Sequence, residues 1–246
     1  MLPNKFLPLF RKHIVNRFHA EKHMILNVKG NKMAVRPGSY DLYVLGEVFW
    51  EQVYAPRVKQ VTASGVILDL GANIGAYSVW AARRWHPGKI VAVEMENDNF
   101  QLLEENIRLN GLRGTVIPVK AAIWNENGKV GIKRHHFNHG MNQVCLDKRE
   151  GGVPSMTLEK LMDMVKVKKI DILKMDIEGA EDRIINETNE RLFAHSVAYL
   201  EAEMHPTKGV QVEKMVAALE KTGFEVIIRR QWLRTTMLLE AVNKHL

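Results

Sequence analysis

Residues 66–78 read Val-Ile-Leu-Asp-Leu-Gly-Ala-Asn-Ile-Gly-Ala-Tyr-Ser. A short aliphatic run is typical of a buried strand, and here a glycine turn and a helical pattern follow it. Gly71 and Gly75 let the backbone approach a ligand closely at the carboxyl edge of an α/β sheet. The stretch therefore predicts a strand, a ligand-binding turn and a helix, in that order.

The same alternation continues along the chain. Strands are predicted over residues 66–70, 90–94, 115–119, 170–176, 197–203, 224–228 and near 235–240, and helices over 74–84, 98–110, 158–165, 180–187 and 210–222. This order predicts a Rossmann-like, doubly wound α/β fold with a mostly parallel seven-stranded sheet. A short turn separates the last two strands, so we expect an antiparallel edge strand.

Length and composition are those of a folded globular chain. The 246 residues are 46% hydrophobic and 26% charged, with 8 prolines and 17 glycines, which excludes disordered and collagen-like classes. No repeat or linker interrupts the chain, so we expect one domain over residues 61–246, after a basic, helical N-terminal extension and lead-in over residues 1–60. The single cysteine, Cys145, and the lack of a long apolar run predict a soluble, cytoplasmic protein with no membrane span.

The charge balance favours acidic partners. Lys and Arg number 35 against 28 Asp and Glu, a net charge of +7 at pH 7. In residues 1–24, basic side chains alternate with apolar ones near helical spacing, which suits an RNA backbone or a membrane surface. The commoner interpretation is a helix packed on the domain by its apolar side.

The glycine turn differs from the dinucleotide-binding G-x-G-x-x-G and from the phosphate loop, so it does not favour a pyrophosphate. Asp69, at the strand tip, suits the ammonium end of an amino-acid-like ligand. Glu94 ends the second strand, where a nucleotide site expects a carboxylate that accepts ribose hydroxyls. Adenosine with an amino-acid tail is S-adenosyl-L-methionine, so the pattern resembles the class I methyltransferases. The predicted loop residues are Gly71, Ala72, Asn73 and Gly75.

A second charged group follows the fourth predicted strand, in the same crevice as the glycine turn. Its members are Lys174, Asp176, Glu178 and Glu181. With the glycine turn and Glu94, the ordered motifs resemble the FkbM family of S-adenosylmethionine-dependent O-methyltransferases, over about residues 36–206. The remaining motifs are Arg36-Pro-Gly-Ser-Tyr-Asp41, Glu47, Tyr54, Asn106-Ile-Arg-Leu-Asn110, Thr157-Leu158 and Glu203-Met-His205.

The resemblance implies methylation of a hydroxyl on a sugar or a natural-product-like small molecule. It also places Met95, Ala121, Ala122 and Asp176 on the cofactor side, with the two alanines near the adenine ring.

A hydroxyl acceptor must lose its proton, which a base or a metal ion can promote. Asp176 and His205 are the candidate bases, with Glu203 expected to orient the histidine and Lys174 to complete the catalytic set. Alternatively, Asp176, Glu178 and Glu203 would hold Mg²⁺, which prefers oxygen ligands. The sequence leaves base and metal open.

Three alternatives are weaker. His135, His136 and His139 lie close enough in sequence to bind a metal, but no acidic or cysteine co-ligand accompanies them. Residues 102–111 also resemble archaeal-type tRNA guanine methyltransferases, although the chain contains no Asn-Pro-Pro or Asp-Pro-Pro motif. The third alternative is a non-catalytic binding module that retains the fold.

Overall fold

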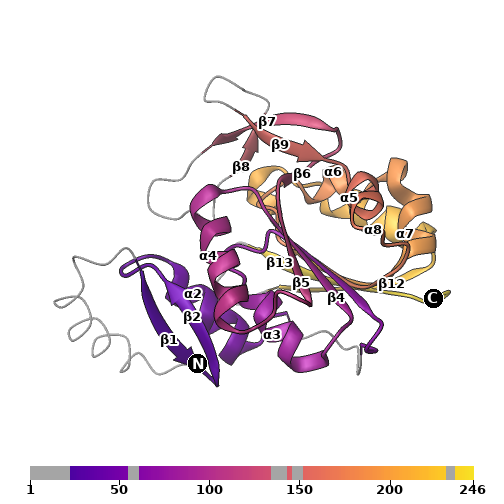
Figure 1. The fold of residues 1–246 in the computed structure, drawn as a ribbon. Coiled ribbons are helices and arrows are strands. Elements are labelled where there is room, and N and C mark those ends of the chain that lie inside the picture. The colour runs from indigo at the N-terminus through magenta and orange to yellow at the C-terminus, as the bar shows by residue number, and fades with distance from the viewer. Residues whose placement is uncertain (1–22, 55–60, 134–142, 146–151, 231–235) are drawn as a thin grey trace.

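The computed structural model describes residues 23–54, 61–133, 143–145, 152–230 and 236–246 (Figure 1). A seven-stranded sheet forms its centre, in the order β12-β13-β11-β10-β3-β4-β5. β3, β4, β5, β10 and β11 run parallel, which confirms the predicted Rossmann-like fold class. The strands are β3 (Val66–Leu70), β4 (Lys89–Glu94), β5 (Val116–Lys120), β10 (Ile170–Met175), β11 (Val197–Met204), β12 (Phe224–Arg230) and β13 (Met237–Asn243).

The two closing strands form the predicted antiparallel pair at one side of the sheet. The antiparallel member, however, is not the edge strand. β13 lies between β11 and β12 and is antiparallel to both, so β12 forms the edge. In this position β13 pairs along its length on both sides, and Glu240 faces Glu201 of β11 and Ile227 of β12.

Helices cover both faces of the sheet (Figure 1). Alternate strand residues point to opposite faces: Ile67 packs with the first helix group and Leu68 with the second. The helix predicted over 180–187 ends at Ile184, because Asn186 caps a 3₁₀ turn over Glu187–Asn189. The following helix, α7, was not predicted. The first group is α3 (Ala76–Trp85) and α4 (Asn97–Leu109), and the second is α5 (Leu158–Met164), α6 (Glu181–Ile184), α7 (Glu190–Ser196) and α8 (Val212–Lys221).

The described part of the N-terminal extension begins with a hairpin. β1 (Met24–Val28) and β2 (Asn31–Val35) pair antiparallel around a two-residue turn. α2 (Asp41–Gly46) and the π-helix η1 (Glu47–Glu51) follow. The basic amphipathic segment was predicted over residues 1–24, and residues 1–22 of it lie outside the described residues.

Two asparagines of α4 fasten this hairpin to the domain. Asn106 accepts a hydrogen bond from the Ala34 amide at 2.6 Å and donates to the Ala34 carbonyl at 3.2 Å. Asn110 makes the same pair of bonds with the backbone of Lys32, at 3.1 and 2.8 Å. Each side-chain amide therefore replaces a neighbouring strand along the free edge of β2. The Asn106–Asn110 spacing, quoted above as a motif, has this structural role.

A small four-stranded sheet lies at the top of Figure 1, in the order β6-β9-β7-β8. Its strands are β6 (Ala122–Ile123), β7 (Gly128–Lys133), β8 (Gln143–Cys145) and β9 (Val153–Met156). Two of these short strands, β8 and β9, follow Lys133, in a region where no strand was predicted. His135, His136 and His139 lie outside the described residues. Among the helices of the described chain, none has the length and apolar character to cross a membrane.

Candidate active site

The glycine turn lies between the end of β10 and helix α4. Gly71 has φ +76°, and a Cβ at this position would stand 1.8 Å from the carbonyl oxygen of Asp176. Gly75 has φ +81°, and its Cβ would stand 2.6 Å from Leu103 Cδ1. Both glycines are therefore required by a left-handed backbone and by close neighbours. The turn brings the predicted cofactor loop directly against Asp176.

Glu94 ends β4 beside this turn. Its carboxylate accepts hydrogen bonds from the amides of Asn73 at 2.8 Å and Glu96 at 2.7 Å. Burial raises the pKa of Glu94 to about 7, and the two backbone bonds only partly oppose this shift. Asn73 Oδ1 is buried without a hydrogen-bond partner among the described residues. A ligand that carries hydroxyl or ammonium donors would satisfy it.

The remaining predicted cofactor residues lie near the ends of β3, β4 and β5. Ala72 is buried, and its amide donates to the Val93 carbonyl. Ala121 and Ala122 are buried, and the Ala121 amide donates to the Glu94 carbonyl. Met95 is half-buried against the apolar cluster that contains Ala122.

Asp69 was expected to face the ligand, and the structure places it elsewhere. Its side chain is completely buried: Oδ2 accepts from Ser78 Oγ at 2.7 Å, and Oδ1 lies 3.1 Å from Lys174 Nζ. Lys174 is also buried and donates to the Gly71 carbonyl at 2.8 Å. Burial acts to lower the pKa of Lys174, but the nearby carboxylates, chiefly Asp69, outweigh it and the net pKa is raised. Asp69 and Lys174 therefore form a buried ion pair under the turn.

Glu203 and Asp176 meet at the phenol of Tyr54. The Tyr54 hydroxyl lies 2.5 Å from Glu203 Oε2 and 3.1 Å from Asp176 Oδ2. Glu203 was expected to orient His205, and this expectation is wrong. The His205 ring contacts other acids, and β11 ends at Met204, before His205.

His205 is oriented by Glu181 instead. Its Nδ1 lies 2.8 Å from Glu181 Oε1, and Glu181 has no exposed surface. Its Nε2 lies 3.3 Å from Glu178 Oε2 and 3.9 Å from Asp176 Oδ1. Burial acts to lower the pKa of His205, but the hydrogen bond and charge of Glu181 and the other two carboxylates raise it to about 9. The imidazole is therefore protonated at neutral pH and is poorly suited to act as a base.

The structure also changes the predicted metal set. Asp176, Glu178 and His205 offer ligand atoms within 4.8 Å of one another, whereas Glu203 does not belong to this group. Lys208 Nζ contacts the Glu178 carboxylate, so the lysine ammonium already neutralises one of the three candidate ligands. Burial, with the charge of Asp176, raises the pKa of Glu178 to about 7, and the charges of His205 and Lys208 oppose this shift.

Two site residues were quoted as motif members without receiving a role. They are Tyr54 and Glu181. The signal for Glu181 was its place two residues after Gly179, whose amide donates a 3.1 Å hydrogen bond to Glu181 Oε1. Tyr54 gave no local signal.

The comparisons with known proteins agree with this geometry. Residues 69–226 match the methyltransferase FkbM domain family. The chain is 22% identical over 223 residues to Methyltransferase sdnD of Sordaria araneosa, which covers 77% of this chain and 85% of that protein. It is 29% identical over 133 residues to the tRNA (guanine(37)-N(1))-methyltransferase Trm5b of Methanocaldococcus jannaschii, which covers 52% of this chain and 38% of that one.

A solved structure has the same fold. The methyltransferase FkbM from Methylobacillus flagellatus KT superposes with a TM-score of 0.57 at 13% identity. The match covers 78% of this chain and 47% of the other, so the chain spans about half the length of that protein. The family match covers more than half of the chain and includes the glycine turn, Glu94, Asp176 and His205. The chain therefore belongs to the FkbM methyltransferase family.

Proposed function

We propose that the chain transfers the methyl group of S-adenosylmethionine to a hydroxyl of a sugar or natural-product-like small molecule. One observation carries this proposal: the cofactor turn packs against the backbone of Asp176, because the Asp176 carbonyl oxygen leaves no room for a side chain at Gly71. A methyl donor and an acceptor must meet in line, so two adjacent half-sites supply much of the catalysis.

The residues of the turn fit this cofactor. The unpartnered Asn73 Oδ1 and the loop backbone suit the methionine part, and Glu94 suits the ribose hydroxyls. Met95, Ala121 and Ala122 would lie along the adenine. When bound, S-adenosylmethionine supplies an electrophilic methyl group. Lys174 and Asp69 act beneath the turn by fixing the Gly71 carbonyl.

Asp176 is the base in this proposal. Its side chain is 25% exposed, and its Oδ1 is a buried atom with no hydrogen-bond partner among the described residues. An acceptor hydroxyl would satisfy that oxygen and transfer its proton there. His205, already protonated, stabilises the negative charge that Asp176 carries before it takes the proton.

The charge of the acceptor side favours a neutral acceptor over RNA. Four acids lie together there, Asp176, Glu178, Glu181 and Glu203, and they outnumber the two cations beside them, His205 and Lys208. The excess negative charge repels phosphate groups. RNA remains the alternative, because the chain carries +7 and is similar over 133 residues to a tRNA methyltransferase.

The donor set fits Mg²⁺ poorly. It combines two carboxylates with an imidazole nitrogen, whereas Mg²⁺ prefers oxygen ligands in an octahedron. Such a mixed set suits a transition metal better. The proposed mechanism uses no metal, and added Mg²⁺ or EDTA is expected to leave the rate unchanged. The single Cys145 suits a reducing compartment, so we place the activity in the cytoplasm.

The test begins with calorimetric titration of the purified protein with S-adenosylmethionine and S-adenosylhomocysteine, with and without MgCl₂. Binding at micromolar strength is expected for both. Transfer of a tritiated methyl group is then measured to a panel of free sugars, methyl glycosides and polyols, and to tRNA transcripts. Transfer to tRNA alone would favour the RNA alternative, and no cofactor binding would favour a non-catalytic module.

A further inference from the structure

We propose that Tyr54 is a positioning residue of the acceptor site, which holds Asp176 and Glu203 in one hydrogen-bonded group. Tyr54 lies outside the family match, which begins at residue 69. This inference rests on the proposed function, because it assigns Asp176 to the acceptor.

The contacts of Tyr54 are made inside the protein. Its side chain is 5% exposed, and its hydroxyl lies 2.5 Å from Glu203 and 3.1 Å from Asp176. Its ring packs edge-on against Tyr77, with centroids 6.0 Å apart, and Lys174 Nζ lies 5.3 Å from its centroid. The ring is therefore fixed from several sides, and the hydroxyl is held between the two carboxylates.

The Tyr54 hydroxyl has one proton to donate to two neighbouring carboxylates. Burial raises the pKa of Tyr54 well above its ordinary value, with the charges of Asp176 and Glu203 adding to the effect, so the phenol keeps its proton. One proton serves one carboxylate at a time, and the shorter contact assigns it to Glu203. The same hydroxyl lies 3.1 Å from Asp176 Oδ2, so it also separates this carboxylate from Glu203.

This arrangement suits a base that takes a proton during each turnover. The Tyr54 hydroxyl fixes the position of Asp176 Oδ2 by a 3.1 Å contact, while Oδ1 is buried without a partner among the described residues. When the acceptor O–H bond breaks, its electron pair stays on the acceptor oxygen and the proton goes to Asp176. With the proton on Oδ1, Asp176 is neutral and no longer repels Glu203, which keeps its bond from Tyr54. Without the hydroxyl, two carboxylates would stand together with no shared proton and would repel each other.

Tyr54→Phe tests the inference, and Tyr77→Phe is its matched control. Both changes delete one hydroxyl and keep the ring. Tyr77 Oη is buried but has no hydrogen-bond partner in the described part of the chain, so its loss should leave the acceptor site unaffected.

The first readout is proton NMR of the hydroxyl, which needs no acceptor. A short, buried O–H···O⁻ bond gives an exchange-protected resonance far downfield. We expect this resonance in the wild type and in Tyr77→Phe, its loss in Tyr54→Phe, and a shift to higher field in Glu203→Gln. Its absence from the wild type, or its presence in Tyr54→Phe, overturns the inference.

The second readout separates positioning from cofactor binding. S-adenosylmethionine affinity, by calorimetry, is expected to stay within about twofold in Tyr54→Phe. With the best acceptor of the sugar and polyol panel, kcat is expected to fall about 100-fold with little change in KM, as for a misplaced catalytic group. An unchanged kcat overturns the inference. A wild type that fails to bind S-adenosylmethionine overturns the proposed function instead, and the NMR result still decides the position of Tyr54.

Discussion

Lys174 Nζ donates a hydrogen bond of 2.8 Å to the carbonyl oxygen of Gly71, so a buried ammonium holds the turn that we assign to the cofactor. The same nitrogen lies 3.1 Å from Asp69, its direct neighbour in the register of β10 and β3. Because these side chains are 4% and 0% exposed, each charge depends on the other. The ion pair therefore connects strands β3 and β10 to the cofactor turn.

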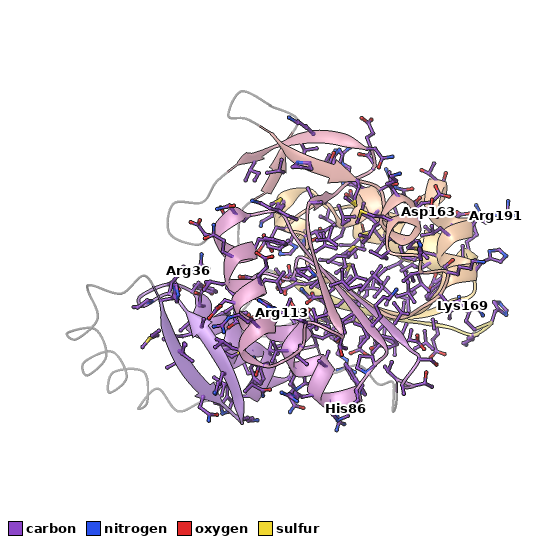
Figure 2. The ribbon with its side chains drawn as sticks, in the orientation of Figure 1. Arg36, His86, Arg113, Asp163, Lys169 and Arg191 are labelled. Carbon is purple, nitrogen blue, oxygen red and sulfur yellow. The ribbon has the colours of Figure 1, made fainter. Side chains whose placement is uncertain are left out.

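Lys174→Met is therefore expected to destabilise the fold by about 3–5 kcal/mol, because it leaves the Asp69 carboxylate buried and unpaired. Urea unfolding measures the loss. Asp69→Asn combined with Lys174→Met should recover part of it, because the buried charge is then gone. Lys169→Met, on the exposed surface labelled in Figure 2, is the control and should change stability by less than about 0.5 kcal/mol. Equal losses for Lys174 and Lys169 would contradict the buried pair.

Glu181→Gln is expected to lower the pKa of His205 from about 9 toward its ordinary value, because it removes the charge that lies 2.8 Å from Nδ1. The titration of the His205 ring resonances by NMR measures this pKa. The exposed Glu187→Gln is the control and should leave it unchanged.

The same shift predicts how stability depends on pH. The folded pKa of His205 is raised above the unfolded value of 6.5, so its stabilising contribution is complete below about pH 6.5 and is lost as the pH rises through about 9. Glu181→Gln should flatten this part of the stability curve. A curve with the same slope in both proteins would show that His205 is not the group responsible.

The sheet and the turn were predictable because their signals are local. Alternating β-branched and helical runs predict the strands of the parallel sheet. Gly71 and Gly75, which lie in one short stretch, predict the turn. The insertion of β13 between β11 and β12 was not predictable, because the pairing of Glu240 with Glu201 depends on strand order and not on either strand's own pattern.

The acceptor side was predicted as a group of residues but not as a set of contacts. Asp176, Glu203 and His205 could be placed at one sheet edge from strand ends alone. Their partners could not, because Tyr54 lies 149 residues from Glu203 and Glu181 lies 24 residues from His205 in the sequence. Whether Asp69 faces a ligand or a lysine depends on the neighbouring strand, and that information is absent from its own motif.

Three Gly→Ala changes separate backbone strain from close packing. Gly114 has open space around it, so Gly114→Ala should be almost neutral. Gly111 also has open space but has φ +67°, so Gly111→Ala should cost about 1 kcal/mol. Gly71 has φ +76°, and a new Cβ would stand 1.8 Å from a backbone oxygen. Gly71→Ala should therefore lower the free energy of unfolding by about 2 kcal/mol more than Gly111→Ala does.

Thermal unfolding ranks the three variants by stability. Calorimetry with S-adenosylmethionine ranks them by cofactor affinity. Gly71→Ala should also weaken cofactor binding, because the turn and Asp176 must move apart, whereas Gly111→Ala should leave the affinity unchanged. Normal binding by a well-folded Gly71→Ala protein would contradict the close approach of the turn to Asp176.

Glu94 makes cofactor binding depend on pH. Ribose hydroxyls bind best to an ionised carboxylate, and burial raises the pKa of Glu94 to about 7. The affinity for S-adenosylhomocysteine should therefore be highest above about pH 7 and should fall below it, by up to about tenfold per pH unit, because binding must first remove a proton. Calorimetry over this range measures the slope.

Variants at Glu94 distinguish this cause from a general effect of acid on the protein. Glu94→Gln should bind weakly at every pH and lose the slope, since an amide does not titrate. Glu94→Ala should bind more weakly still, because the Asn73 and Glu96 amides then lose their shared acceptor. The exposed Glu104→Gln should retain both the affinity and the slope of the wild type. If Glu94→Gln instead binds as tightly as the wild type, the ribose assignment is wrong and Glu94 serves only to hold the turn.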